Sequence, residues 1–277
     1  SVAILAQVAN SIVVVGNPSL GLARVRMGSA LAPLLFPLPA RQRWDLRNLR
    51  DSKELRWVST RTCGDTPALY VQRPDAKYTL LYTHGNAEDL GELMMVLPPM
   101  AARCGANIFA VEYPGYSISV AEQPSEAGCY EAVEAAWDHL VQKEQVDPRL
   151  IVPFGRSLGS GPAVHLASMK KEPPGLVLQS PLESGARAVM NKTIGYIGYF
   201  VDPFKNYTKV DGIEAKTCII HGTADKVVPC SNGEGLYESL RARGKAVEPL
   251  WINGRGHNDM PPEEVYDRVK KFLTTEL

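Results

Sequence analysis

The chain has 277 residues, 45% of them hydrophobic and 22% charged, and its 30 basic and 30 acidic residues give a formal net charge of zero. That length fits a single α/β domain, and the balanced charge argues against a nucleic-acid-binding protein. Five scattered cysteines without CxxC spacing predict reduced thiols, no metal site and a cytoplasmic location.

The N-terminal segment differs from the rest of the chain. Residues 1–15 are apolar, and the next 30 residues include four arginines: Arg24, Arg26, Arg41 and Arg43. The apolar run is too short to span a bilayer, so we expect it to pack on the domain, with peripheral contact at an anionic membrane surface as the alternative. We therefore divide the chain into an N-terminal extension, 1–50, and an α/β domain, 51–277.

Periodicity predicts the secondary structure of the domain. Two alternating runs within 54–72 predict an antiparallel hairpin. Short apolar runs then predict six buried strands, at 78–83, 107–113, 150–154, 175–180, 217–222 and 247–252. Helical periodicity lies between and after them, at 88–104, 125–145, 158–171, 232–244 and 262–276. This alternation predicts a mostly parallel sheet with an antiparallel start and helices on both faces.

A nucleophile-elbow pattern, GRSLG at 155–159, joins the third of these strands to a helix. A serine raised on so sharp a turn needs glycine at plus and minus two, because the neighbouring backbones pass closely there. Ser157 is therefore the candidate nucleophile. The alternative is a small buried residue in an ordinary tight turn.

A serine nucleophile needs an imidazole base and a carboxylate that orients it. His257 lies in the loop GRGHND after the last predicted strand, and Asp225 follows the strand before it. The order Ser157, Asp225, His257 is that of hydrolases with this elbow. Asp225 has an alternative role as the cap of a turn. Three other aspartates are weaker candidates for the acid: Asp202, Asp211 and Asp259.

Acyl transfer also needs backbone donors for the developing oxyanion. The elbow supplies the amide of Leu158. The loop HGN after strand 78–83 supplies the second donor, for which we choose the amide of Asn86 over that of Ala87. We expect His84 to hold this loop by hydrogen bonding and not to act as a base.

The segment 183–215 interrupts the alternation and is a candidate small cap. Its aromatic residues Tyr196, Tyr199 and Phe200 predict an apolar substrate wall, with a core-packing crossover as the equal alternative. Arg156, beside the nucleophile, is a candidate for setting the charge preference of the substrate.

Five segments together resemble the α/β-hydrolase domain-containing protein 17 family over roughly residues 78–277. They are THGNAEDLG (83–91), GRSLG (155–159), LQSPLESGAR (178–187), IIHGTADKVV (219–228) and AVEPLWINGRGHND (246–259). The resemblance implies an α/β-hydrolase fold and a serine hydrolase that removes S-linked palmitate from membrane-associated proteins, with Ser157, Asp225 and His257 as its triad. The implied partner is an S-acylated protein or an acyl lipid, and no cofactor is needed.

The chain departs from this family at three places. Arg156 stands where members usually carry an uncharged residue, and YPGYSISVAEQP replaces a glycine-richer segment. The family's cysteine-rich, lipid-modified N-terminus has no counterpart before Cys63. Two other functions remain open: a lysophospholipase or monoacylglycerol-type esterase with the same triad, and a ligand-binding protein without turnover on a hydrolase scaffold.

Overall fold

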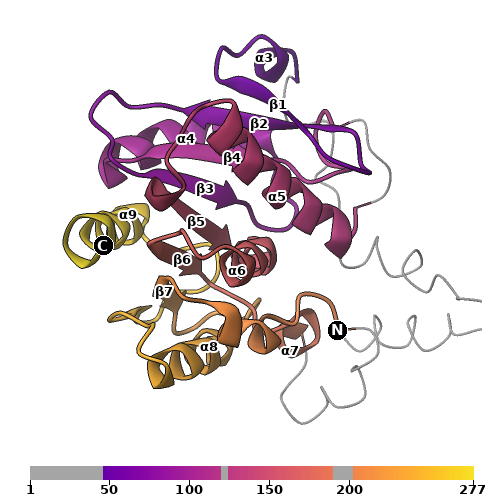
Figure 1. The fold of residues 1–277 in the computed structure, drawn as a ribbon. Helices are drawn as coiled ribbons and strands as arrows, with labels where there is room; N and C mark the ends of the chain where they lie inside the picture. Colours follow the sequence, from indigo (N-terminus) through magenta and orange to yellow (C-terminus); the bar gives the residue numbers. More distant parts are fainter. Residues whose placement is uncertain (1–45, 120–123, 190–201) are drawn as a thin grey trace, which may run out of the picture.

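A computed structural model describes residues 46–119, 124–189 and 202–277 of the chain (Figure 1). Its centre is an eight-stranded sheet of order β1-β2-β4-β3-β5-β6-β7-β8. The strands are β1 (Leu55–Ser59), β2 (Asp65–Val71), β3 (Thr79–Thr83), β4 (Asn107–Val111), β5 (Ile151–Arg156), β6 (Gly175–Gln179), β7 (Lys216–Gly222) and β8 (Leu250–Ile252). β2 pairs antiparallel with β1 and with β4, and all other pairs are parallel. The mostly parallel sheet with an antiparallel start is therefore confirmed.

Helices cover both faces of the sheet (Figure 1). They are α3 (Leu46–Arg50), α4 (Leu90–Cys104), α5 (Glu126–Gln142), α6 (Ser160–Met169), α7 (Gly185–Val189), α8 (Ser231–Ala242) and α9 (Pro262–Lys271). One apolar core joins α4 and α9 to one face, and two further cores join α5, α6 and α8 to the other. On the surface, Arg103 of α4 forms a two-pronged ion pair with Asp267 of α9, at 2.8 and 2.7 Å.

The central strands are continuously apolar because both of their faces are buried. In β3, Leu80 and Tyr82 pack into the core under α4 and α9, whereas Leu81 packs into the core under α5. A strand with helices on both sides has no solvated face, so its sequence shows an apolar run in place of alternation.

Side-chain caps fix where the first two long helices begin. The Ser125 hydroxyl accepts the N–H of Gly128 at 3.0 Å at the start of α5. The Asp89 carboxylate accepts the N–H of Glu92 at 3.0 Å at the start of α4. Both bonds satisfy donors that the first turn of a helix leaves open.

Several element boundaries differ from their predicted positions, among them those of β8, α6 and α9. β8 starts at Leu250, not at 247, because Pro249 has no N–H to donate to a ladder; before it, Ala246 only bridges Thr217. α6 starts at Ser160, after a 3₁₀ turn over Ser157–Gly159. α9 ends at Lys271 and continues as a wider helical turn over Phe272–Glu276.

Two predicted features lie largely outside the described residues. They are the N-terminal extension, of which 1–45 are not described, and the middle of the segment 183–215, which includes Tyr196, Tyr199 and Phe200. The division into extension, domain and cap therefore stays a prediction. Within the described ranges, no helix combines the length and the apolar character needed to cross a membrane.

Candidate active site

The elbow holds Ser157 in a backbone conformation that is rare for a residue with a side chain. Its φ is 53°, in the left-handed region, and it directly follows β5. A Cβ on Gly155 would lie 2.5 Å from the carbonyl oxygen of Gly159, and one on Gly159 would overlap the carbonyl of Thr83. The two glycines are thus required by close backbone packing, and the strained turn presents the serine at the edge of the sheet.

The structure brings Ser157, His257 and Asp225 together in one hydrogen-bonded row. His257 Nε2 lies 2.9 Å from Ser157 Oγ, and His257 Nδ1 lies 2.7 Å from Asp225 Oδ2. The residues follow β5, β7 and β8, whose carboxyl ends meet at one edge of the parallel sheet. The Asp225 side chain is 0% exposed and that of His257 is 8% exposed. A buried carboxylate therefore backs an imidazole that contacts a serine hydroxyl.

The Asp225 carboxylate accepts hydrogen bonds at both oxygens. Oδ1 accepts the N–H groups of Val227 and Val228 at 2.8 and 2.9 Å, and Oδ2 faces two imidazoles. Burial by itself would raise the pKa of Asp225, but hydrogen bonds from His221 and His257, together with the imidazole charge, lower it well below its ordinary value. Asp225 is therefore ionised and fixes the proton of His257 on Nδ1, which leaves Nε2 to accept the serine proton.

His221 is a second imidazole at Asp225 that its sequence position does not single out. It is fully buried, and its Nε2 lies 2.9 Å from the Val228 carbonyl oxygen and 3.3 Å from Asp225 Oδ2. Its ring therefore faces the same Asp225 oxygen as the ring of His257. The available signal was the spacing of His221 and Asp225, four residues apart across a strand end.

His84 holds the loop after β3, as expected. Its Nε2 lies 2.8 Å from Glu112 Oε1 and its Nδ1 lies 2.9 Å from the Gly85 carbonyl oxygen. The other Glu112 oxygen accepts the N–H of Leu90 at 3.0 Å, and the Tyr113 hydroxyl donates to the His84 carbonyl at 2.7 Å. Both ring nitrogens of His84 are thus engaged inside the protein. Glu112 was missed, although a charged residue at the end of an apolar run was a visible signal.

The loop after β3 holds both candidates for the second oxyanion donor, the amides of Asn86 and Ala87. The Ala87 N–H donates to the Asn86 side-chain oxygen at 3.1 Å, and the Tyr116 hydroxyl donates to the same oxygen at 3.0 Å. The Ala87 amide is therefore occupied within the loop. The oxyanion roles of Asn86 and Leu158 stay predictions.

Arg156 is engaged by protein groups. Its Nη1 forms an ion pair with Glu88 Oε1, and its Nη2 donates to Asn258 Oδ1 at 2.9 Å. Glu88 lies in the loop after β3, and Asn258 follows His257. Sequence reasoning placed Arg156 beside the nucleophile but missed both partners, and a substrate contact of Arg156 stays a prediction.

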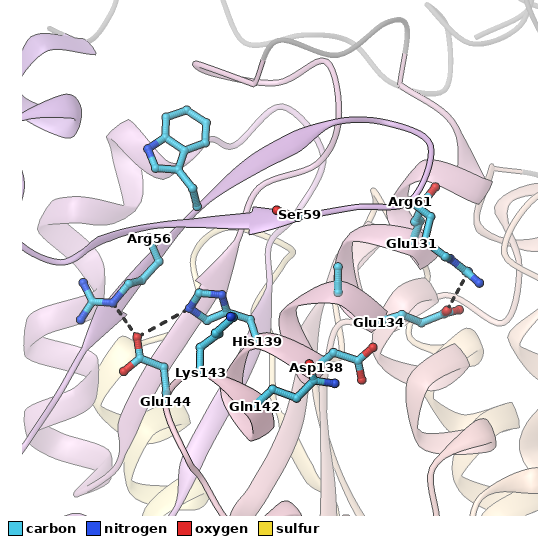
Figure 2. Close-up of a pocket in the computed structure, with 12 residues that line it drawn as sticks. Arg56, Ser59, Arg61, Glu131, Glu134, Asp138, His139, Gln142, Lys143 and Glu144 are labelled. Carbon is cyan, nitrogen blue, oxygen red and sulfur yellow. Dashed lines mark hydrogen bonds and ion pairs between the residues drawn. The ribbon is translucent and has the colours of Figure 1, made fainter.

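Two cavities flank these elements. One of about 220 Å³ lies at α4 and α9, and its lining includes His257, Arg156, Glu88 and Asn258 but not Ser157. A larger hollow of about 540 Å³ lies between β1 and α5 (Figure 2). There the charged groups pair with each other, for example Arg56 with Glu144 at 2.6 Å. Ser59 and His139 also line this hollow, but none of the three triad residues does.

Comparison with known proteins shows likeness in sequence and in fold. The chain is 40% identical to alpha/beta hydrolase domain-containing protein 17B of Xenopus tropicalis over 205 residues, which cover 74% of this chain and 69% of that protein. It is 38% identical to the human protein 17C over 205 residues, 74% of this chain but only 60% of that relative. A model of the prolyl oligopeptidase family matches residues 188–277. Among solved structures, a Pyrococcus furiosus esterase superposes with a TM-score of 0.66 at 21% identity, covering 85% of this chain and 98% of that one.

Proposed function

The chain belongs to the α/β-hydrolase domain-containing protein 17 family, and from that premise we propose that it is a serine hydrolase that cleaves fatty-acyl thioesters. The observation that carries the proposal is the row of contacts from Ser157 Oγ through the His257 ring to Asp225 Oδ2, at 2.9 and 2.7 Å. A hydroxyl, an imidazole and a buried carboxylate in this order can activate the serine at neutral pH.

In the proposed reaction, Ser157 Oγ attacks the carbonyl carbon of the acyl thioester while His257 Nε2 takes the hydroxyl proton. The tetrahedral oxyanion is stabilised by the amides of Leu158 and Asn86. The C–S bond then breaks, and His257 returns the proton to the departing thiolate. Water attacks the acyl-serine ester with His257 again as the base, which releases the fatty acid and restores the serine.

The surroundings of the triad favour an acyl group. Leu158 and Val228, which neighbour the nucleophile and the acid, belong to an apolar cluster that also includes Leu182, Ala188 and Phe204. These buried side chains make the interior beside the triad apolar, and apolar surroundings suit a hydrocarbon chain better than a charged substrate. The choice of a protein thioester over another acyl compound rests on the family resemblance.

The first prediction concerns Ser157→Ala. Hydrolysis of a short p-nitrophenyl ester and of an S-palmitoyl peptide should fall by about 10³-fold or more, because the residual rate comes from binding and oxyanion stabilisation alone. A fluorophosphonate probe should label the wild type and not the variant. Ser168→Ala is the matched control, since this serine lies in α6 and its hydroxyl only donates to the His165 carbonyl.

Two outcomes would contradict the proposal in different ways. Full ester hydrolysis by Ser157→Ala, or no labelling of the wild type, would reject a serine nucleophile. A wild type that hydrolyses a lysolipid much faster than the S-palmitoyl peptide would keep the nucleophile but reject the thioester substrate.

A further inference from the structure

Arg156 connects three segments that carry different parts of the triad site. It is the last residue of β5 and directly precedes Ser157. Its guanidinium reaches Glu88 in the loop after β3 and Asn258 in the loop after β8, which lie 68 and 102 residues away in sequence. The first loop, residues 84–89, contains Asn86 and is called the oxyanion loop below. The second, residues 253–261, contains His257 and is called the histidine loop.

Glu88 extends this connection to the backbone of the oxyanion loop. One carboxylate oxygen of Glu88 pairs with Arg156, and the other accepts the N–H of Gly85 at 2.7 Å. A Cβ placed on Gly85 would lie only 3.0 Å from Arg156 Nη1, so the loop backbone packs directly on the guanidinium. A charged group held between a carboxylate and an amide oxygen gives a more rigid link than a neutral side chain of similar length.

The position of Arg156 argues against direct contact with the reacting atoms. Its side chain is only 17% exposed, and its charge is already paired with Glu88. Its guanidinium partners share the 220 Å³ cavity on the α4 and α9 side, which Ser157 does not line. The guanidinium therefore acts on the loops around the nucleophile and is not aimed at an acyl carbonyl.

We propose that Arg156 is a positioning residue that, through Glu88 and Asn258, fixes the oxyanion loop and the histidine loop relative to the nucleophile. This role rests on the proposed function, since it concerns the same site. Loosening the link displaces the Asn86 amide and the His257 ring without removing either group. Because both act mainly in the transition state, kcat should fall while KM changes little.

The test is a double-mutant cycle on Arg156→Met and Glu88→Gln, with hydrolysis of a short p-nitrophenyl ester as the activity. Each single variant should lose about tenfold in kcat, less than complete loss of an oxyanion donor causes, and the double variant should be little worse than the poorer single variant. Asn258→Ala, at an exposed residue, should give a smaller loss in the same direction. Arg156→Lys keeps the positive charge but loses the planar guanidinium with its several N–H donors. It should therefore retain only part of the activity that Arg156→Met loses.

Hydrogen exchange gives a readout that does not depend on turnover. In Arg156→Met, amide exchange in residues 84–90 and 255–259 should accelerate, because Gly85 loses its ordered acceptor. Arg103→Met is the matched control, since it also breaks a two-pronged arginine–carboxylate pair, the one between α4 and α9. The control should leave kcat and the exchange of both loops unchanged.

The failure of this role and of the proposed function are distinguishable. A wild type without esterase activity would reject the proposed function, whereas exchange that accelerates in Arg156→Met would still support the link. Unchanged exchange in both loops would overturn the positioning role. So would independent, additive losses in the cycle, or a rise in KM at constant kcat, which would indicate that Arg156 binds substrate instead.

Discussion

Asp225 shows how the chemistry of a single residue is set by its neighbours. Two backbone N–H groups bond one oxygen, and two imidazoles face the other. The same contacts hold the carboxylate in place and keep it ionised. The orientation of His257 therefore depends on the loop over residues 225–228 and on His221 as much as on Asp225 itself.

We expect Asp225→Asn to lower the free energy of unfolding in a pH-dependent way. The pKa of Asp225 is lower in the folded than in the unfolded protein, so the ionised carboxylate stabilises the fold above about pH 4, the range of a free aspartate. This contribution, on the order of 2 kcal/mol, is lost as the pH falls below that range. Urea denaturation of both proteins between neutral and acid pH would measure it.

The difference between wild type and Asp225→Asn should thus be constant near neutral pH and shrink in acid. Asp211→Asn is a suitable control, because the Asp211 side chain is 97% exposed and lies 3.8 Å from Arg243. It should show little difference at any pH. If the difference in the free energy of unfolding between wild type and Asp225→Asn did not change with pH, the difference would reflect packing and not charge.

The three triad residues could be predicted from sequence because each lies in a loop or turn that follows a strand, within a motif that contains glycine. The groups that hold them were not found. Arg156 ends β5, whereas Glu88 and Asn258 lie in two loops far from it in the chain, and nothing local to any one of the three specifies the other two. His221 was visible as a residue at a strand end, but its closeness to Asp225 depends on how the chain turns after β7.

At the scale of elements, the strands of the middle of the sheet were predicted well because parallel pairing buries them on both faces. The element boundaries that differ from prediction lie where a local feature, such as a proline or a tight turn, interrupts the periodic pattern. Pro249 shortens β8, and the elbow moves the start of α6 from 158 to Ser160. The 3₁₀ turn itself has no periodic signal, since it spans only three residues.

The capping contact of α5 predicts a measurable loss of stability. Ser125→Ala removes the acceptor for the Gly128 N–H and should reduce the free energy of unfolding by about 1 kcal/mol. The activity of the folded protein should change little, because the lost bond lies at the start of α5 and involves no triad residue. Urea denaturation would measure the loss.

Ser239→Ala provides the comparison for this helix cap. Its hydroxyl donates to the Gly235 carbonyl within α8 and satisfies no open N–H. We expect its effect to stay within about 0.5 kcal/mol, the usual range for surface substitutions. Equal effects of the two substitutions would show that the cap is not what stabilises α5.

At the scale of the whole molecule, the thiols report whether the domain is folded. Cys63 and Cys230 are half-buried, whereas Cys104 and Cys218 are buried in one core and Cys129 is buried in another. Burial raises the pKa of Cys230 to about 11 and those of Cys104 and Cys218 to about 12, and that of Cys129 also rises. Since the thiolate is the reactive form, burial suppresses both access and reactivity.

An aromatic disulfide reagent at mildly alkaline pH should therefore modify Cys63 quickly and Cys230 slowly in the native protein. All five thiols should react together once guanidinium unfolds the domain. Cys63→Ser should abolish the fast phase and leave the others unchanged. Rapid reaction of three or more thiols without denaturant would show that the cores open readily.

The ion pair between Arg103 and Asp267 joins residues 164 positions apart in the chain. During translation, α4 is made long before α9. The part of α4 that packs on α9 therefore stays exposed while most of the protein is translated. His257 and β8 emerge in the same late stretch as α9. A nascent chain halted before this stretch would be a client for chaperones and would lack the base, so hydrolytic chemistry cannot begin until this last part of the chain is made.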